Sequence, residues 1–208
     1  MAKSAKKSET IPFVSPWLAA RYPKISDPDT KGAYADGKFK TDTLFLDDAD
    51  EEKTRKTLRE AAKKLWPDVE LDDVALPLKE FFDGKDEEKT SAGMGLVFKS
   101  QYRPAVFDAK KKKLPEGAKI GGGSEIRVAS AIFPWSKAEK QTVVENGKKR
   151  QENVTAYGVG LRLGDVQVRK LVEFAGGGDG SAFDEVEGFE YDGEGDAGSS
   201  GGDDATEL

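Results

Sequence analysis

Only residues 47–66 have the apolar spacing of an α-helix, while most of the remaining chain alternates with the two-residue period of β-strands. Acidic residues crowd the start of this segment, where they suit the positive end of a helix, and Pro67 ends it. A single helix without βαβ alternation is a poor match to a doubly wound sheet and indicates a mainly β domain. The apolar helical positions share one face: Leu58, Ala61, Ala62, Leu65 and Trp66.

Strand patterns are clearest in residues 38–46, 125–133 and 155–163, where every second residue can face a core. Shorter strands are expected at residues 96–102 and 104–108, and a last one after a turn at Gly164-Asp165. In all we expect five to seven short strands. With the helix, they fit a small, partly open barrel that has one inserted helix.

Prolines, glycines and charged residues indicate the connections. Aromatic residues alternate with prolines in residues 12–28, which suits an edge strand and an irregular loop. The acidic residues 67–92 are expected to form a loop. Pro134-Trp135 is expected to end the strand at 125–133, and residues 136–152 then form a charged loop or a hairpin arm.

The composition excludes much chemistry, because the 208 residues include no cysteine and no histidine. Disulfides, thiolate or imidazole zinc sites and Cys-His or Ser-His catalytic pairs are therefore ruled out. The glycine-rich segments match neither a P-loop nor a dinucleotide fingerprint. The carboxylates lie in caps, loops and the C-terminal segment, without the apolar surroundings that acid catalysis needs. We therefore expect no enzyme, no cofactor and no metal.

Charge divides the chain into unequal parts. Residues 176–208 contain eleven acids, ten glycines and no lysine or arginine, which leaves 28 acids and 33 bases in residues 1–175. We expect a flexible basic arm at 1–10, a folded domain at 11–175 and a disordered acidic tail at 176–208. No secretion signal or membrane span is expected, so the protein should act in the cytoplasm.

Basic and aromatic residues are interleaved along the predicted strands. Single-strand nucleic-acid binders need both, since cations follow the phosphates and rings stack on the bases. The competing interpretation is that the rings form the core and the cations a solvated face. A function from another class also stays open: an acidic-tailed interaction protein or chaperone that binds basic proteins. The candidate DNA-binding residues are Lys38, Phe39, Lys40, Lys99, Tyr102, Arg103, Phe107, Lys111, Arg127, Trp135, Lys137, Lys148 and Arg150.

Two runs of sequence resemble a known family: VFDAKKKKLPEGAKIGGGSEIRVASAIFPW at 106–135 and GLRLGDVQVRKLVEFAGGGDGSAFDEVEGFEY at 160–191. They are similar to the single-stranded-DNA-binding replication proteins of short-tailed bacteriophages. The resemblance implies an OB-fold, a five-stranded, partly open Greek-key barrel with a long helix inserted after an early strand. It places Lys38, Phe39, Lys40 and Trp135 in the DNA-binding groove.

The same resemblance implies a sequence-independent role in phage DNA replication and recombination, in the cytoplasm of the infected bacterial host. Such proteins coat and anneal single strands and recruit the replicative DNA polymerase and the helicase-primase through the tail. A homodimer stays open. The chain departs from the family in ending on Leu208, where an aromatic residue is usual. The tail residues expected to contact partners are Phe183, Phe189, Tyr191, Asp203, Asp204, Glu207 and Leu208.

Overall fold

The computed structural model describes residues 9–30, 35–84, 89–145 and 148–172, for residues 141–145, 148, 149 and 152 the backbone alone. These ranges lie within the first of two units into which the contacts divide the chain, Met1–Phe174. The expected basic arm lies almost entirely, and the acidic tail wholly, outside them. The structure therefore leaves both as predictions.

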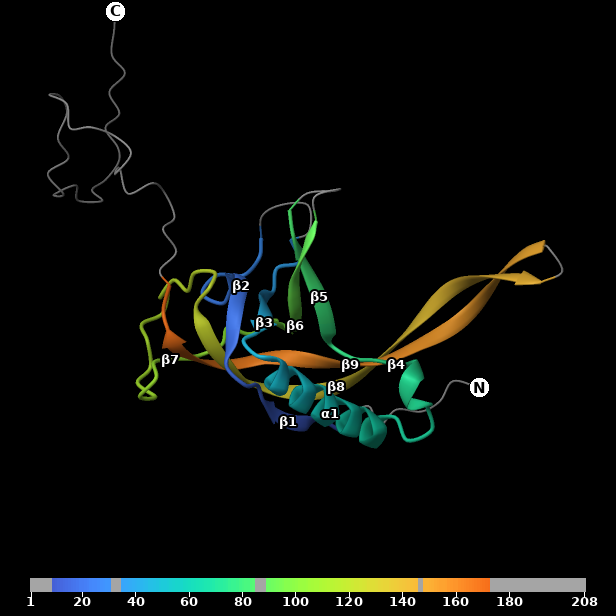
Figure 1. Ribbon diagram of the computed structural model, residues 1–208, viewed down its shortest axis with the longest axis horizontal. Coiled ribbons are helices and arrows are strands. Elements are labelled where there is room, and N and C mark those ends of the chain that lie inside the picture. Colours follow the sequence, from blue (N-terminus) through green and yellow to red (C-terminus); the bar gives the residue numbers. More distant parts are fainter. Residues whose placement is uncertain (1–8, 31–34, 85–88, 146–147, 173–208) are drawn as a thin grey trace, which may run out of the picture. The chain divides into compact units, whose positions relative to one another are not determined.

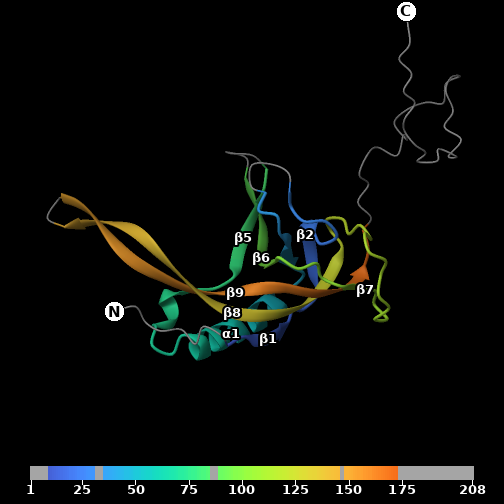
Figure 2. The same cartoon turned by 180° about the vertical axis from the view of Figure 1, so that it is seen from behind.

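Five strands close into a barrel, which confirms the mainly β OB-fold (Figures 1 and 2). They are β2 (Leu18–Lys24), β3 (Phe39–Phe45), β6 (Thr90–Ser100), β9 (Lys148–Lys170) and β8 (Glu125–Glu145). Around the ring, β2 pairs with β3, β3 with β6, β6 with β9, β9 with β8, and β8 with β2. The β6–β9 pairing is parallel and the others are antiparallel. The ring is closed, although the β6–β9 and β2–β8 seams each contain only two residue pairs.

Helix α1 (Asp48–Leu65) follows β3, as the sequence predicts. The Asp47 side chain accepts a hydrogen bond of 2.8 Å from the Asp50 backbone N–H and so caps the first turn. At the other end, the Trp66 backbone N–H donates to the Ala62 carbonyl. The apolar face of α1 is buried in one core with the inward residues of the barrel, among them Leu18, Phe98 and Ile126.

Two threonines, Thr41 and Thr43, are fully buried on the inward face of β3. The Thr43 hydroxyl donates to the Leu96 carbonyl at 3.0 Å and accepts from the Leu96 backbone N–H at 3.3 Å. Because these hydrogen bonds satisfy the hydroxyl, its burial carries no large penalty. The predicted alternation of residues 38–46 is thus confirmed.

The predicted strand count is wrong. Several predicted boundaries are wrong as well, because β8 and β9 run through them. The described residues contain nine strands rather than five to seven. Pro134 does not end β8, since the pairing with β1 (Ile11–Val14) stops at Ile132 and Pro134 has β9 as its neighbour. A proline is tolerated where one edge of a strand needs no N–H donor. The expected turn at Gly164-Asp165 is a bulge, in which these two residues oppose Ala129.

The sequence allows a loop or a hairpin arm at residues 136–152, and the described residues of this segment form a hairpin arm. β8 and β9 stay paired from Ser136↔Tyr157 to Glu145↔Lys148, and Figures 1 and 2 both show this ribbon extending from the barrel. We call residues 136–145 and 148–157 the arm.

Two other segments, one expected to be a loop and one an edge strand with an irregular loop, contain more paired strand than predicted. Residues 67–92 include the 3-10 turn Leu71–Asp73, β4 (Val74–Ala75) and β5 (Leu78–Asp83), with β5 antiparallel to β6. β2 is a barrel strand despite the prolines around it, because Pro23 falls at a bulge between Arg21 and Lys24. The short β7 (Val106–Phe107) pairs with β9.

Candidate nucleic-acid interface

Four basic residues stand in register across four neighbouring strands. Lys24 of β2 pairs with Lys40 of β3, Lys40 with Lys99 of β6, and Lys99 with Arg162 of β9. We call these residues the cation row. Their strand neighbours include the buried Phe98, so alternation directs the row to the outside of the barrel. With strands about 4.8 Å apart, the row crosses about 14 Å.

Carboxylates of the segment that precedes β3 partly neutralise the middle of this row. Lys40 forms ion pairs with Asp29 and, at 3.5 Å, with Asp36, and Lys99 lies 3.5 Å from Asp36. The hydrogen bond to Asp29 is the main reason why the pKa of Lys40 is raised above its ordinary value. Burial opposes ionisation of Asp36, but the Lys38 N–H and the nearby lysine charges together lower its pKa. These carboxylates hold the two lysines in place in the middle of the row.

Asp42 lies beside the row on β3, opposite Arg21 on one side and Val97 on the other. Burial raises the pKa of this carboxyl group above its ordinary value, while the charges of Lys79, Lys99, Lys40 and Arg21 oppose the shift. An ionised Asp42 therefore adds a further negative charge beside the row and would weaken the binding of an anion there.

Two aromatic side chains lie next to the Arg162 end of the cation row, on the outward positions of β8. Phe133 pairs with Gly160 and Trp135 with Gly158. A Cβ atom at Gly160 would lie 2.6 Å from the Phe133 ring, and one at Gly158 would lie 2.2 Å from the Trp135 indole. The rings therefore lie against the glycine backbone, where a side chain would displace them. Both residues remain partly exposed, and the Arg162 guanidinium lies 5.9 Å from the Phe133 ring centroid.

The predicted residues around Phe39 gather at one end of β3 and β6. Phe39 pairs with Ser100 and packs partly against the core, and the Arg103 guanidinium lies 5.8 Å from its ring centroid. Tyr102 is 77% exposed. Lys38, immediately before β3, accepts a hydrogen bond from the Asp29 N–H through its carbonyl. The Phe39 side chain is thus partly buried against the core, while the Tyr102 side chain is exposed and accessible to a ligand.

Three other predicted residues form a different cluster. Phe107, Lys111 and Arg127 line one hollow of about 290 Å³, next to the bulge of β9. The Arg127 guanidinium lies 4.8 Å from the Trp17 ring centroid, and Arg169 lies at the same distance from that ring. The barrel therefore does not bring these three residues into the cation row.

The arm carries the three remaining predicted residues of the body. Lys137 pairs with Ala156, Lys148 with Glu145 and Arg150 with Val143. Lys137 lies 3.4 Å from Glu139 and is otherwise well exposed. The predicted partner-binding residues of the tail lie outside the described residues: Phe183, Phe189, Tyr191, Asp203, Asp204, Glu207 and Leu208.

The sequence prediction missed five residues of the outward surface: Arg21, Tyr22, Lys24, Phe133 and Arg162. Arg162 and Phe133 alternate with predicted core residues along their strands. This alternation indicates that their side chains point outward. Lys24 and Tyr22 lie in the proline-rich segment, where the sequence has no regular period.

The described residues contain no cluster of acidic side chains arranged to hold a metal ion. In the same part of the chain, no helix is long and apolar enough to cross a membrane.

No protein-family model matches the sequence, and the search of curated proteins finds no match either. Among solved structures, the chain is similar to gp2.5, a single-stranded DNA-binding protein encoded by bacteriophage T7. The identity is 20% and the TM-score 0.53, over 88% of this chain and 100% of that one. The two share a fold.

The chain also matches the single-stranded DNA-binding protein from bacteriophage Enc34 in complex with ssDNA, at 17% identity and a TM-score of 0.48. That match covers 84% of this chain and 100% of the other. A C-terminal truncation of the Enc34 protein matches at 18% identity and a TM-score of 0.47, over 83% of this chain and 98% of that one.

Proposed function

We propose that the protein binds single-stranded DNA without sequence preference through the outer face of its barrel. The observation that carries this proposal is the cation row, Lys24, Lys40, Lys99 and Arg162, with Phe133 and Trp135 at one end. Cations in a line can follow a phosphate backbone, and rings stack on any base. Neither contact reads a base edge, so binding tolerates all sequences.

The shared fold supports the proposal. OB-folds use the outer face of their strands and the adjoining loops to bind oligonucleotides, and gp2.5 is a single-stranded DNA-binding protein with this fold. The described surface is suited to binding an extended anion rather than to catalysis. We accordingly propose a binding protein and not an enzyme.

We further propose that the protein belongs with the replication proteins of short-tailed bacteriophages and acts in the cytoplasm of an infected bacterium. In this role it coats single strands, promotes their annealing and serves replication and recombination. The acidic residues 176–208 would recruit the replicative polymerase and the helicase-primase. Support comes from the sequence resemblance and from the tail's eleven acids without a cation.

The salt dependence of binding tests the main proposal. Titrating the full chain with oligo-dT at several salt concentrations, with tryptophan fluorescence as the signal, should give a log–log slope near −3. That value follows from about four phosphate contacts at about −0.7 each on a single strand. Replacing Lys40 and Lys99 by alanine should reduce the slope by about 1.4.

The matched control is the double variant Lys56→Ala, Lys63→Ala, which removes two lysines from the exposed surface of α1. It should leave the slope nearly unchanged. Equal salt slopes for the wild type and the variant that lacks Lys40 and Lys99 would contradict the proposed interface. If the wild type does not bind DNA but binds basic proteins, the result would favour the alternative function, an acidic-tailed interaction protein or chaperone.

The tail proposal has its own test. Deleting residues 179–208 should tighten oligo-dT binding most at low salt, since a tethered polyanion competes with DNA at high effective concentration and salt screens the attraction. The same deletion should abolish polymerase binding. A truncated protein with unchanged affinities for both would refute the proposed role of the tail.

A further inference from the structure

Tyr22 adopts a backbone conformation that is unusual for its residue type. Its φ angle is +44°, in the left-handed region, where a large side chain is rarely found. The residue lies in the β2 bulge, where Tyr22 and Pro23 together oppose Thr41 of β3. Strain of this kind persists only where the surrounding structure enforces it, and it is concentrated at functional sites.

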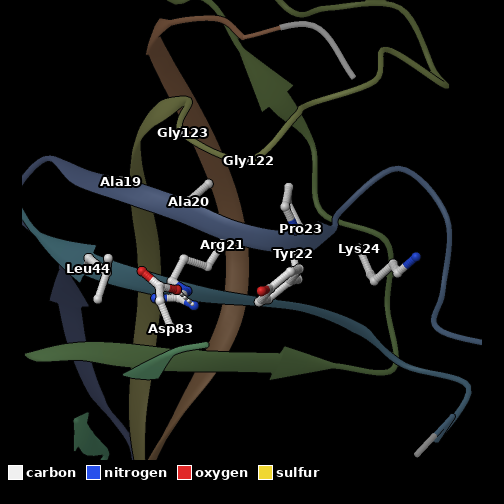
Figure 3. A pocket seen from close by; sticks show the side chains of 10 residues that line it. All are labelled: Ala19, Ala20, Arg21, Tyr22, Pro23, Lys24, Leu44, Asp83, Gly122 and Gly123. Carbon is white, nitrogen blue, oxygen red and sulfur yellow. Dashed lines mark hydrogen bonds and ion pairs between the residues drawn. The ribbon is translucent and has the colours of Figure 1, made fainter. Parts of the chain in front are cut away.

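The bulge brings the Tyr22 ring to the same side as its neighbour Arg21, whereas successive residues of a regular strand point to opposite faces. The Arg21 guanidinium lies 5.5 Å from the Tyr22 ring centroid and 5.5 Å from that of Phe81. Its ion pair with Asp83, at 2.8 Å, fixes it further. Figure 3 shows the Tyr22 ring beside Arg21, with Asp83 next to the guanidinium. Arg21 therefore holds the ring in one place.

The ring is held in place and yet it is not covered. Tyr22 is 74% exposed, although burying an aromatic ring is normally favourable. It lines a hollow of about 590 Å³ together with Arg21, Lys24, Asp83, Gly122 and Gly123. A Cβ atom at Gly122 would have only the Ala20 carbonyl oxygen nearby, at 3.9 Å. The glycine turn thus leaves this side of the hollow open.

The hollow adjoins the cation row at the end away from Phe133, because Lys24 belongs to both. We propose that Tyr22 is a stacking platform for a nucleobase of single-stranded nucleic acid, on which one base rests while Lys24 and Lys40 hold the adjoining phosphates. The proposal rests on the proposed function and extends it, since it gives the bound strand an aromatic contact at each end of the cation row. Arg21 acts as a positioning residue that keeps the ring in its exposed orientation.

A purely structural role would leave two observations unexplained. If Tyr22 only covered Arg21, burial of the ring would be the expected result, and the ring is mostly exposed. If the bulge only relieved Pro23, a glycine or asparagine would suit position 22 better than tyrosine. A base platform accounts for the exposure and for the enforced conformation together.

The test compares oligo-dT with an abasic strand of equal length, which has the same phosphates but no bases. Affinities of the full chain are measured by fluorescence anisotropy of end-labelled strands. Tyr22→Ala should weaken oligo-dT binding about 5- to 150-fold, the usual loss for one stacked base, and leave binding of the abasic strand unchanged. Tyr22→Phe, which keeps the ring, should bind both strands as the wild type does.

The matched control is Phe82→Ala, since Phe82 is another exposed ring, at 49%, and does not line the hollow. It should not change either affinity. Unchanged oligo-dT binding by Tyr22→Ala overturns the inference, and so does an equal loss on both strands, which would indicate a distorted β2. A wild type that binds neither strand overturns the proposed function itself, so the two failures are distinguishable.

Discussion

The two ends of the cation row present aromatic rings in opposite ways. At the Arg162 end, Phe133 and Trp135 stand in regular register with β9 and rest on glycines that make room for them. At the Lys24 end, Tyr22 stands on a bulge with a left-handed backbone and rests on a guanidinium. At the Arg162 end the rings are accommodated by glycines of the neighbouring strand β9. At the Lys24 end the ring is presented by a distortion of β2, the strand that carries it.

This difference concerns how stability and binding are coupled. Rings that pack on a glycine backbone belong to the folded barrel, so a change there should affect the fold and the ligand together. A ring held on a strained bulge lowers the stability of the fold while it remains available to a ligand. A substitution that crowds a ring at the Arg162 end should therefore lower the stability of the fold. A substitution that relieves the strained backbone at the Lys24 end should raise it.

The largest effect is expected for Gly158→Ala. The new Cβ atom would lie 2.2 Å from Cζ2 of Trp135, so the indole must move, and the Trp66 Nε1–H bond to the Gly158 carbonyl lies at the same site. Overpacking of this kind costs about 1–3 kcal/mol, and oligo-dT binding should weaken as well. Urea unfolding and anisotropy measure the two losses.

Gly122→Ala is the control for that variant, because its Cβ atom would meet no atom closer than 3.9 Å. It should unfold at the same urea concentration as the wild type. If Gly158→Ala were equally stable, the indole would not rest on the glycine as described.

A smaller effect is expected for Asp42→Asn, which removes a carboxylate from between the two ends. Affinity for oligo-dT at neutral pH should rise about threefold to tenfold, on the order of 1 kcal/mol, as expected for one repulsive charge near the surface. The gain would reduce the share of binding that depends on the rings at either end. Equal affinities of the two proteins at neutral pH would show that Asp42 does not face the ligand.

The pH dependence of the Asp42 effect has a definite sign. Because burial raises the folded-state pKa of this carboxyl group above its ordinary value of 3.8, the folded protein holds the proton more tightly than the unfolded chain. Stability due to the protonated form is lost as the pH rises through the raised pKa. Below that pKa Asp42 is neutral, so the affinities of wild type and Asp42→Asn should converge on acidification.

The smallest effect is expected for Tyr22→Gly, which should raise the free energy of unfolding by about 0.5 kcal/mol. Relief of a left-handed conformation gains about 1–2 kcal/mol, and the flexibility of glycine in the unfolded chain takes back about 0.5–1. Lys111→Gly is the matched variant, because Lys111 is the other non-glycine residue with positive φ in the described chain, at 65°. A marked loss of stability in Tyr22→Gly would show that the ring supports the fold.

The sequence predicted those parts of the fold that depend on local patterns. The helix was recognisable because acidic residues crowd its start, Pro67 follows it and its apolar residues share a face. The strand at residues 125–133 was recognisable because Ile126, Val128 and Ile132 alternate with outward residues and are all buried. Its continuation through Pro134 was not, because a proline is compatible with a strand only if one edge is free, and pairing alone determines that.

The candidate site was predicted less well, because it depends on register between distant strands. Lys40 and Lys99 were proposed from their neighbours in sequence, yet the parallel seam that aligns Lys99 with Arg162 has no local signature. Tyr22 lies between Arg21 and Pro23, where neither alternation nor helical spacing exists. Its outward, held position follows from a bulge that only the pairing of β2 with β3 reveals.

The two short seams of the barrel have a consequence for the order in which it assembles. β8 and β9 are neighbours in sequence and pair along their whole length, whereas β2 meets β8 through Leu18↔Ile126 and Ala19↔Glu125, more than a hundred positions apart. Local pairing forms quickly, and distant pairing must first overcome the entropy of closing a long loop. We expect the long hairpin to form early and the β2–β8 seam to close last. In the native state the same seam should open first, so its amide protons should exchange with solvent before those at the centre of the hairpin.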